Sequence, residues 1–134
     1  MKSVVLDASA MLAFLRGESG CDRVLASLLS EEAHCVAHAI NACEVYYDIL
    51  RSAGESAAEA AISKLEAAGV EIRSDMDAGF WKGVARRKAI GRISLADCCG
   101  LALTEVLDGE FHSADHHELD DLAAAGDVRI VFIR

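Results

Sequence analysis

The chain alternates short apolar runs with longer segments in which apolar residues recur every three or four positions. The first run, residues 2–6, ends in the apolar residues Val4, Val5 and Leu6 and is typical of a strand buried on both faces. The segments between such runs have the spacing of amphipathic helices. Strands are expected at residues 2–6, 34–37, 70–73, 109–115 and 128–133, and helices at residues 8–18, 20–30, 39–52, 55–69, 75–90, 94–107 and 117–125.

Strands that alternate with helices favour a parallel sheet with helices on both faces. The expected fold class is therefore α/β, a three-layer α/β/α sandwich around a central parallel sheet. The 134 residues are close to the commonest size of one domain, and no linker or repeat divides them. We expect residues 1–134 to form a single domain.

Composition does not alter the expected fold class, but it indicates the cellular compartment of the protein. The apolar N-terminal stretch is interrupted by Asp7 and followed by Arg16, which is too early for a membrane span or a secretory signal. Five cysteines, with Cys98 and Cys99 adjacent, suit neither a disulfide framework nor a zinc site, and we expect them to be reduced core residues. The sequence therefore predicts a cytoplasmic protein that is not in a membrane.

The net charge of −9 is unfavourable for a protein that binds a phosphate backbone. One segment, residues 82–92, runs against this trend because it contains no acid at all. Its basic residues are Lys82, Arg86, Arg87, Lys88 and Arg92. Either this segment contacts phosphate groups, for which Arg86, Arg87 and Arg92 are the candidates, or it is a solvated helix face.

Acidic residues stand where the elements of a parallel sheet would meet. Asp7 and Asp115 follow expected strands, and ligands of such sheets bind at the carboxyl ends of the strands. Asp97 falls in the first turn of a helix that would start at the same edge. Glu44 shares a helical face with Ile40, Cys43 and Tyr47, a face expected to point inward, where a carboxylate is costly without compensation.

Each acid also has an ordinary structural explanation. Asp7 could cap the following helix, Asp97 could complete a capping box with Ser94, and Asp115 could close a turn. Glu44 could point to water or pair with an arginine. Four such coincidences are less economical than one common cause.

That common cause would be a hard divalent cation, because the four acids form an oxygen-only environment. Mg²⁺ or Mn²⁺ held by Asp7, Glu44, Asp97 and Asp115 would activate water for phosphodiester hydrolysis, and whether one ion or two bind stays open. The hydroxyls of Ser9 and Ser113 would orient a ligand water or phosphate, although capping and packing explain them equally well. His116 would contact substrate or belong to a solvated loop.

Four segments resemble, in order and spacing, the acidic motifs of the PIN domain family, and the VapC-type toxins most of all. They are VVLDASAMLAFL, NACEVYYDIL, ISLADCCGLAL and FHSADHHELDDL. This resemblance implies a Mg²⁺- or Mn²⁺-dependent endoribonuclease in which Asp7, Glu44, Asp97 and Asp115 bind the metal. It also implies a homodimer held inactive by a cognate antitoxin. The residues after Asp115 depart from the usual basic or aromatic pattern. We expect an antitoxin arginine to pair with the carboxylates.

Two other interpretations remain. A PIN-like module that binds RNA or a protein without catalysis would carry the same motifs. A receiver-type signalling domain also holds Mg²⁺ at such an edge, but it needs a nearby lysine, and Lys64, Lys82 and Lys88 all fall in expected helices.

Overall fold

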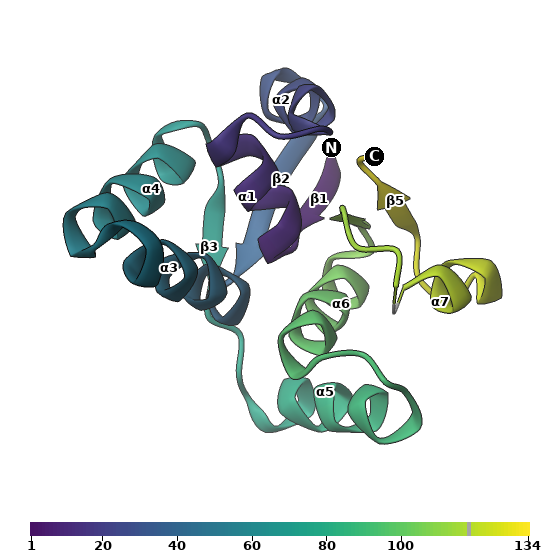
Figure 1. Cartoon of the computed structure of the whole chain (residues 1–134). Coiled ribbons are helices and arrows are strands. Elements are labelled where there is room, and N and C mark those ends of the chain that lie inside the picture. Colours follow the sequence, from purple (N-terminus) through teal and green to yellow (C-terminus); the bar gives the residue numbers. More distant parts are fainter. Residues whose placement is uncertain (118) are drawn as a thin grey trace.

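The computed structural model describes residues 1–117 and 119–134, and in them a five-stranded sheet is flanked by helices (Figure 1). The strands are β1 (Lys2–Leu6), β2 (Ala33–His38), β3 (Glu71–Arg73), β4 (Glu110–Ser113) and β5 (Ile130–Phe132). The helices are α1 (Ala8–Arg16), α2 (Cys21–Leu29), α3 (Ala39–Ala53), α4 (Glu55–Ala67), α5 (Ala78–Ile90), α6 (Leu95–Leu107) and α7 (Asp120–Ala125).

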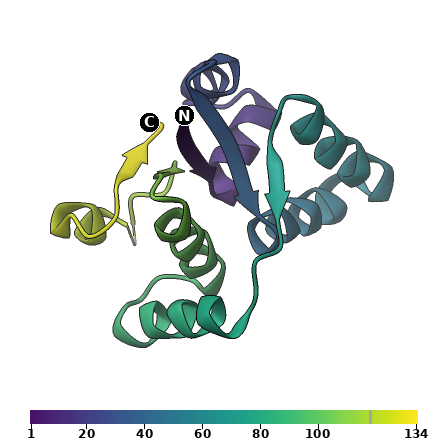
Figure 2. The ribbon, with the colours of Figure 1, turned by 180° about the vertical axis from the view of Figure 1, so that it is seen from behind.

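The sheet has the order β3-β2-β1-β4-β5, and each neighbouring pair is parallel. β1 is the central strand, and its side chains point alternately into the cores on the two faces of the sheet. Val4 and Leu6 pack into a core with α1 to α4, whereas Val5 packs into a second core with α5 and α6. All three are fully buried, which is worth roughly 1.5–3 kcal/mol for each side chain. The result is the expected three-layer α/β/α sandwich (Figures 1 and 2).

Every strand and helix that the sequence predicts is present, with shifts at the ends. Helix α5 begins at Ala78 and not at Asp75, because Asp77 is its N-cap and accepts a hydrogen bond from the Phe80 amide. The strand expected to reach Asp115 ends at Ser113. Helix α7 begins at Asp120, and Glu118, which the predicted helix included, lies outside the described residues.

The predicted inward face of α3 is wrong. Ile40, Tyr47 and Leu50 are about two-fifths exposed and Cys43 is exposed as well. The face that packs inward consists of Asn41, Ala42, Val45 and Ile49. Val45 and Ile49 of that face belong to the core that α3 shares with α1, α4 and β1. Glu44 lies at the border between the two faces and is half-buried.

The prediction that the cysteines lie in the core is correct for Cys35, Cys98 and Cys99, which are buried, and wrong for the exposed Cys43; Cys21 is half-buried, and all five are free thiols. None of the helices in the described part of the chain is both long and apolar enough to cross a bilayer.

Candidate functional site

Asp7 is the most buried acid at the carboxyl edge of the sheet, with 2% of its surface exposed. It directly follows β1 and is the N-cap of α1, so its Oδ1 accepts a hydrogen bond of 2.9 Å from the Ala10 amide. The same oxygen accepts a hydrogen bond of 2.6 Å from the Ser9 hydroxyl. The capping explanation for Asp7 is therefore correct, and it fixes the carboxylate at the edge where a ligand would bind.

Ser9 and Ser113 connect the turns after β1 and β4. Their hydroxyl oxygens are 3.3 Å apart, and Ser9 Oγ accepts a hydrogen bond of 2.9 Å from the Ala114 amide. Ser113 Oγ accepts one of 3.0 Å from the Asp115 amide. Because β1 and β4 are neighbours, these bonds place Asp7 and Asp115 at one edge of the sheet.

The electrostatics of this edge are dominated by like charges. Burial raises the pKa of Asp7, and the Asp115 carboxylate adds to this, although hydrogen bonds from Ser113, Ser9 and Ala10 oppose it. Burial and the nearby Asp7 carboxylate also raise the pKa of Glu44. Among the described residues, no Lys, Arg or His forms an ion pair with Asp7, Glu44 or Asp115. These three acids therefore have no cationic partner within the described part of the chain.

Asp97 lies in the first turn of α6 and is 9% exposed. Its amide donates to Ser94 Oγ at 3.1 Å, which confirms half of the predicted capping box. Asn41 links this turn to the start of α3, because its Nδ2 donates to the Ala96 carbonyl at 3.3 Å. Sequence reasoning missed Asn41, because the sequence does not show that this amide, three residues before Glu44, is buried.

The side chain of Asn41 is fully buried, and its Oδ1 has no hydrogen-bond partner in the described part of the chain. A Cβ at Gly100 would lie 3.0 Å from that oxygen and 2.5 Å from the ring of Phe111. Gly100 thus allows α6 to approach the sheet closely, which sets the position of the turn that carries Asp97.

The acids do not all converge. Within residues 1–117 and 119–134, no three His, Cys, Asp or Glu side chains are close enough to hold one metal ion together. Asp7 is coupled electrostatically to both Asp115 and Glu44, while Asp115 Oδ1 accepts a hydrogen bond of 2.9 Å from the His117 amide. The donor atoms are all oxygens, and Asp7, Glu44 and Asp115 have no cationic partner among the described residues, which fits a hard cation that retains several waters.

His116 is engaged elsewhere. Its ring stacks on Phe132 with centroids 3.9 Å apart, and its two nitrogens contact Asp120 Oδ1 and the Arg134 carbonyl, each at 2.8 Å. These contacts hold the C-terminal strand beside the turn that carries Asp115. The arrangement supports a structural role for His116 more than a contact with substrate.

The basic segment, residues 82–92, covers most of α5 and the start of the following turn. Some of its basic side chains bond to other residues of the protein, and others are exposed. Arg87 forms an ion pair with Glu105 of α6, and the Lys88 ammonium donates to the Ile93 carbonyl at 2.9 Å. Arg86 and Arg92 are exposed. The two line different hollows, Arg86 beside α6 and Arg92 beside α7.

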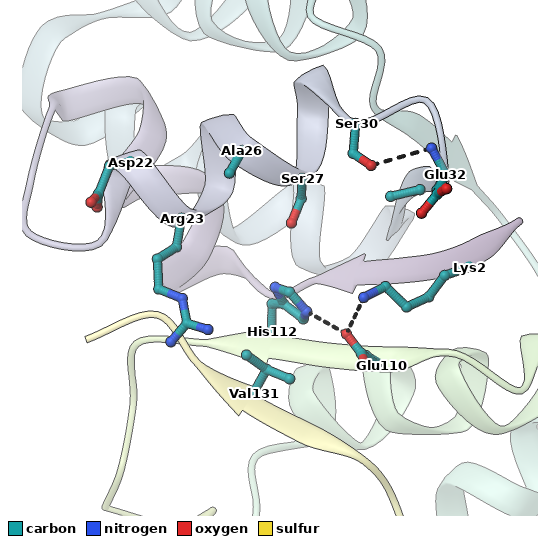
Figure 3. Close-up of a pocket in the computed structure, with 11 residues that line it drawn as sticks. Lys2, Asp22, Arg23, Ala26, Ser27, Ser30, Glu32, Glu110, His112 and Val131 are labelled. Atoms are coloured by element: carbon teal, nitrogen blue, oxygen red, sulfur yellow. Dashed lines mark hydrogen bonds and ion pairs between the residues drawn. The ribbon is translucent and has the colours of Figure 1, made fainter.

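A larger hollow, of about 710 Å³, lies at the opposite edge of the sheet, between α2 and β4. Figure 3 shows Lys2 and His112 directed at Glu110, whose Oε1 lies 3.3 Å from Lys2 Nζ and 3.1 Å from His112 Nε2. Asp22 and Glu32 also line it, so three acids face two strong bases, Lys2 and Arg23. This hollow has no surplus of positive charge for a phosphate backbone.

The chain is an α/β protein with a five-stranded parallel sheet between two layers of helices, and Asp7 and Asp115 follow its neighbouring strands β1 and β4. Within that class, the chain belongs to the PIN domain family, whose model matches residues 4–125. No curated protein matches the sequence.

Solved structures show the same fold at low identity. A toxin–antitoxin complex from Klebsiella pneumoniae has a chain with a TM-score of 0.72 and 12% identity, and 98% of each chain is covered. VapC20 of Mycobacterium tuberculosis, described as a sarcin–ricin loop cleaving toxin, has a TM-score of 0.71 and 16% identity over 92% of this chain and 95% of that one. DNA-bound VapBC from Salmonella typhimurium gives 0.72 and 13%, over all of both chains.

Proposed function

We propose that this chain is a Mg²⁺- or Mn²⁺-dependent endoribonuclease and the toxin of a toxin–antitoxin pair. One observation carries the proposal: Asp7 is buried beside Glu44 and Asp115 with no cationic side chain of the described residues paired to any of them. Burying like charges together is costly, and a divalent cation removes that cost. Membership of the PIN domain family supports a nuclease.

The proposed ligands are Asp7, Glu44, Asp97 and Asp115. Mg²⁺ is held by few carboxylates and keeps several waters, so the four acids need not all contact it directly. A bound ion would supply Lewis acidity, which lowers the pKa of a coordinated water and stabilises charge on the leaving oxygen.

The protein's own groups would position these ligands and the RNA. Ser9 and Ser113 hold the Asp7 carboxylate and link it to the Asp115 turn. Of the three arginines proposed to bind phosphate, Arg86 and Arg92 are exposed, whereas Arg87 is already paired with Glu105 and would contribute chiefly by fixing α5.

The toxin assignment draws on the neighbours with the same fold, several of which are described as VapBC or toxin–antitoxin complexes. An antitoxin that supplies an arginine would place a guanidinium among acids that lack one. Stoichiometric antitoxin should then abolish cleavage, and replacement of that arginine by alanine should restore it.

We also propose a homodimer. The exposed stripe of α3, formed by Ile40, Cys43, Tyr47 and Leu50, is an apolar surface of the kind that pairs with a second copy. Tyr47→Asp should shift the protein from dimer to monomer in sedimentation analysis. A dimer unchanged by this substitution would remove α3 from the interface.

The nuclease proposal is tested with purified, antitoxin-free protein and total cellular RNA in Mg²⁺, in Mn²⁺ and in EDTA. Asp7→Asn keeps an N-cap residue but removes a ligand charge, so it should stop metal-dependent cleavage while the fold persists. Asp127→Asn, at an exposed acid, is the matched control and should cut normally. If Asp7→Asn cuts as fast as wild type, another site is responsible. If folded wild-type protein cuts no RNA, a binding module becomes the better interpretation.

A further inference from the structure

A hollow of about 590 Å³ lies between the end of α5 and α7. Its apolar walls include Ile90, Ile93 and Leu122, and its charged or polar side chains are Arg87, Arg92, His117 and Asp121. Its volume and its combination of an apolar wall with a few polar groups are those of a small-ligand site. The proposed metal ligands do not line it.

The hollow nevertheless adjoins both acid-bearing turns. The backbone amide of His117 donates to Asp115 Oδ1 at 2.9 Å, so one wall is bonded to that carboxylate. Ile93 immediately precedes Ser94, whose hydroxyl accepts from the Asp97 amide at 3.1 Å. A molecule in this hollow would therefore sit beside a group bound between Asp97 and Asp115.

Of the basic side chains in or beside the hollow, Arg87 and Lys88 have partners within the protein, whereas Arg92 has none among the described residues. Arg87 is held by Glu105, and Lys88 is held by the Ile93 carbonyl, which ties the turn of residues 91–93 to α5. Arg92 is exposed and makes no hydrogen bond or ion pair with any residue that the structure describes. It is thus available for a phosphate next to the hollow.

We infer that this hollow receives one unstacked nucleobase of the RNA, next to the phosphate that is cut. The inference rests on the proposed nuclease function. A base has two apolar faces, which aliphatic side chains, an imidazole and guanidinium planes can cover, and RNA is recognised by protein chiefly where its bases are splayed out of the helix. A base inside a duplex cannot enter a hollow of this kind, so the site selects unpaired nucleotides.

Two exposed alanines of α7 offer a matched test, because Ala125 lines the hollow and its neighbour Ala124 does not. Ala125→Trp fills the hollow, whereas Ala124→Trp adds the same ring outside it. The substrate is a short stem-loop RNA containing the mapped cut site, made either with all its bases or with one abasic ribose beside the cut. Wild type and Ala124→Trp should cut the abasic RNA about tenfold more slowly than the intact RNA.

Ala125→Trp should cut both RNAs at the same reduced rate. If it keeps the wild-type preference for the intact RNA, the base does not bind here and the inference fails. A second assay needs no cleavage: fluorescence anisotropy of a labelled single-stranded RNA in EDTA. Binding should weaken about tenfold for Ala125→Trp and not for Ala124→Trp. Equal binding by the two variants would overturn the inference, while absence of cleavage alone would count only against the nuclease.

Discussion

Glu110 and Asp7, at opposite edges of the sheet, have different charged neighbours. At the amino edge, Lys2 and His112 both contact the Glu110 carboxylate, so its charge is balanced within the protein. At the carboxyl edge, Asp7 is buried more deeply, and its charged neighbours are the carboxylates of Glu44 and Asp115. The larger hollow lies at the balanced edge, whereas the family and the motifs point to the unbalanced one.

Under the proposed function, the charges at the two edges indicate the site better than the volumes of their hollows do. Hydrogen bonds and ion pairs hold the pKa of Glu110 below its ordinary value, although burial alone would raise it. The pKa of Asp7 is raised, because burial and a like charge outweigh its hydrogen bonds. A buried acid whose pKa is raised destabilises the fold in its charged form, so it is a candidate for a functional role.

Removing one carboxylate from each edge tests this contrast most directly. Asp115→Asn should reduce metal-dependent RNA cleavage by at least about 100-fold, more than is typical for groups that only support a metal ligand. Glu110→Gln should leave the cleavage rate within about twofold of wild type, because small surface-proximal changes away from the site rarely disturb it. Rates with a defined RNA at saturating Mg²⁺ measure both variants.

A comparable loss in both variants would mean that the fold is disturbed or that the amino edge takes part in catalysis. Circular dichroism of each variant separates these two explanations. Full activity of Asp115→Asn would remove Asp115 from the site.

Metal should stabilise the protein through Asp7. An ion that binds only the folded state adds about 2.7 kcal/mol at 100 times its dissociation constant, which raises the melting temperature of wild type by roughly 10 °C in a domain of this size. In Asp7→Asn this increase should vanish. In EDTA, Asp7→Asn should melt above wild type, because the substitution removes a buried charge and keeps an N-cap.

Differential scanning calorimetry with and without Mg²⁺ gives all four melting temperatures. An equal increase in both proteins would place the ion away from Asp7. A lower melting temperature of Asp7→Asn in EDTA would show that the carboxylate stabilises the apo fold, contrary to its raised pKa.

The sequence was sufficient for the fold because its periodicities were consistent. Residues 2–6 form an uninterrupted strand, and Asp7 and Ser94 are the caps that the pattern predicted. It failed for α3, where spacing alone assigned the wrong face to the core. Apolar residues recurred on two faces of that helix, and packing against α4 and α6 decided between them.

The positions of the candidate acids at strand ends and helix starts could be predicted, because chain order sets them. The contacts that fix them could not be. The bond between the Asn41 amide and Ala96 joins residues 55 apart, and the Ser9–Ser113 contact joins residues 104 apart. Nor does spacing show that Arg87 is paired with Glu105 or that His116 stacks on Phe132.

The close approach of α6 to the sheet gives a smaller, structural effect. Gly100→Ala would put a methyl group 2.5 Å from the buried ring of Phe111, and overpacking of this kind costs about 1–3 kcal/mol. Better helix propensity offsets about 1 kcal/mol of that cost. Gly83→Ala in α5 has the same gain in propensity and no contact nearer than 3.9 Å. Urea unfolding should therefore show Gly100→Ala destabilised and Gly83→Ala slightly stabilised, and equal shifts would contradict the packing argument.

The smallest effect concerns pH at the balanced edge. Because the pKa of Glu110 is lowered in the folded protein, its ion pair stabilises the fold above about pH 4.3, the ordinary value for Glu, and this contribution is lost as the pH falls through the folded pKa. Lys2 is 55% exposed, which limits the contribution to less than about 1 kcal/mol at neutral pH. Glu110→Gln should thus be slightly less stable than wild type at pH 7, and this deficit should be smaller at pH 3. Urea unfolding at both values measures the difference, and a gap that widens as the pH falls would show that Glu110 is not held in its charged form. Balanced charge at this edge would then no longer distinguish it from the edge that carries Asp7.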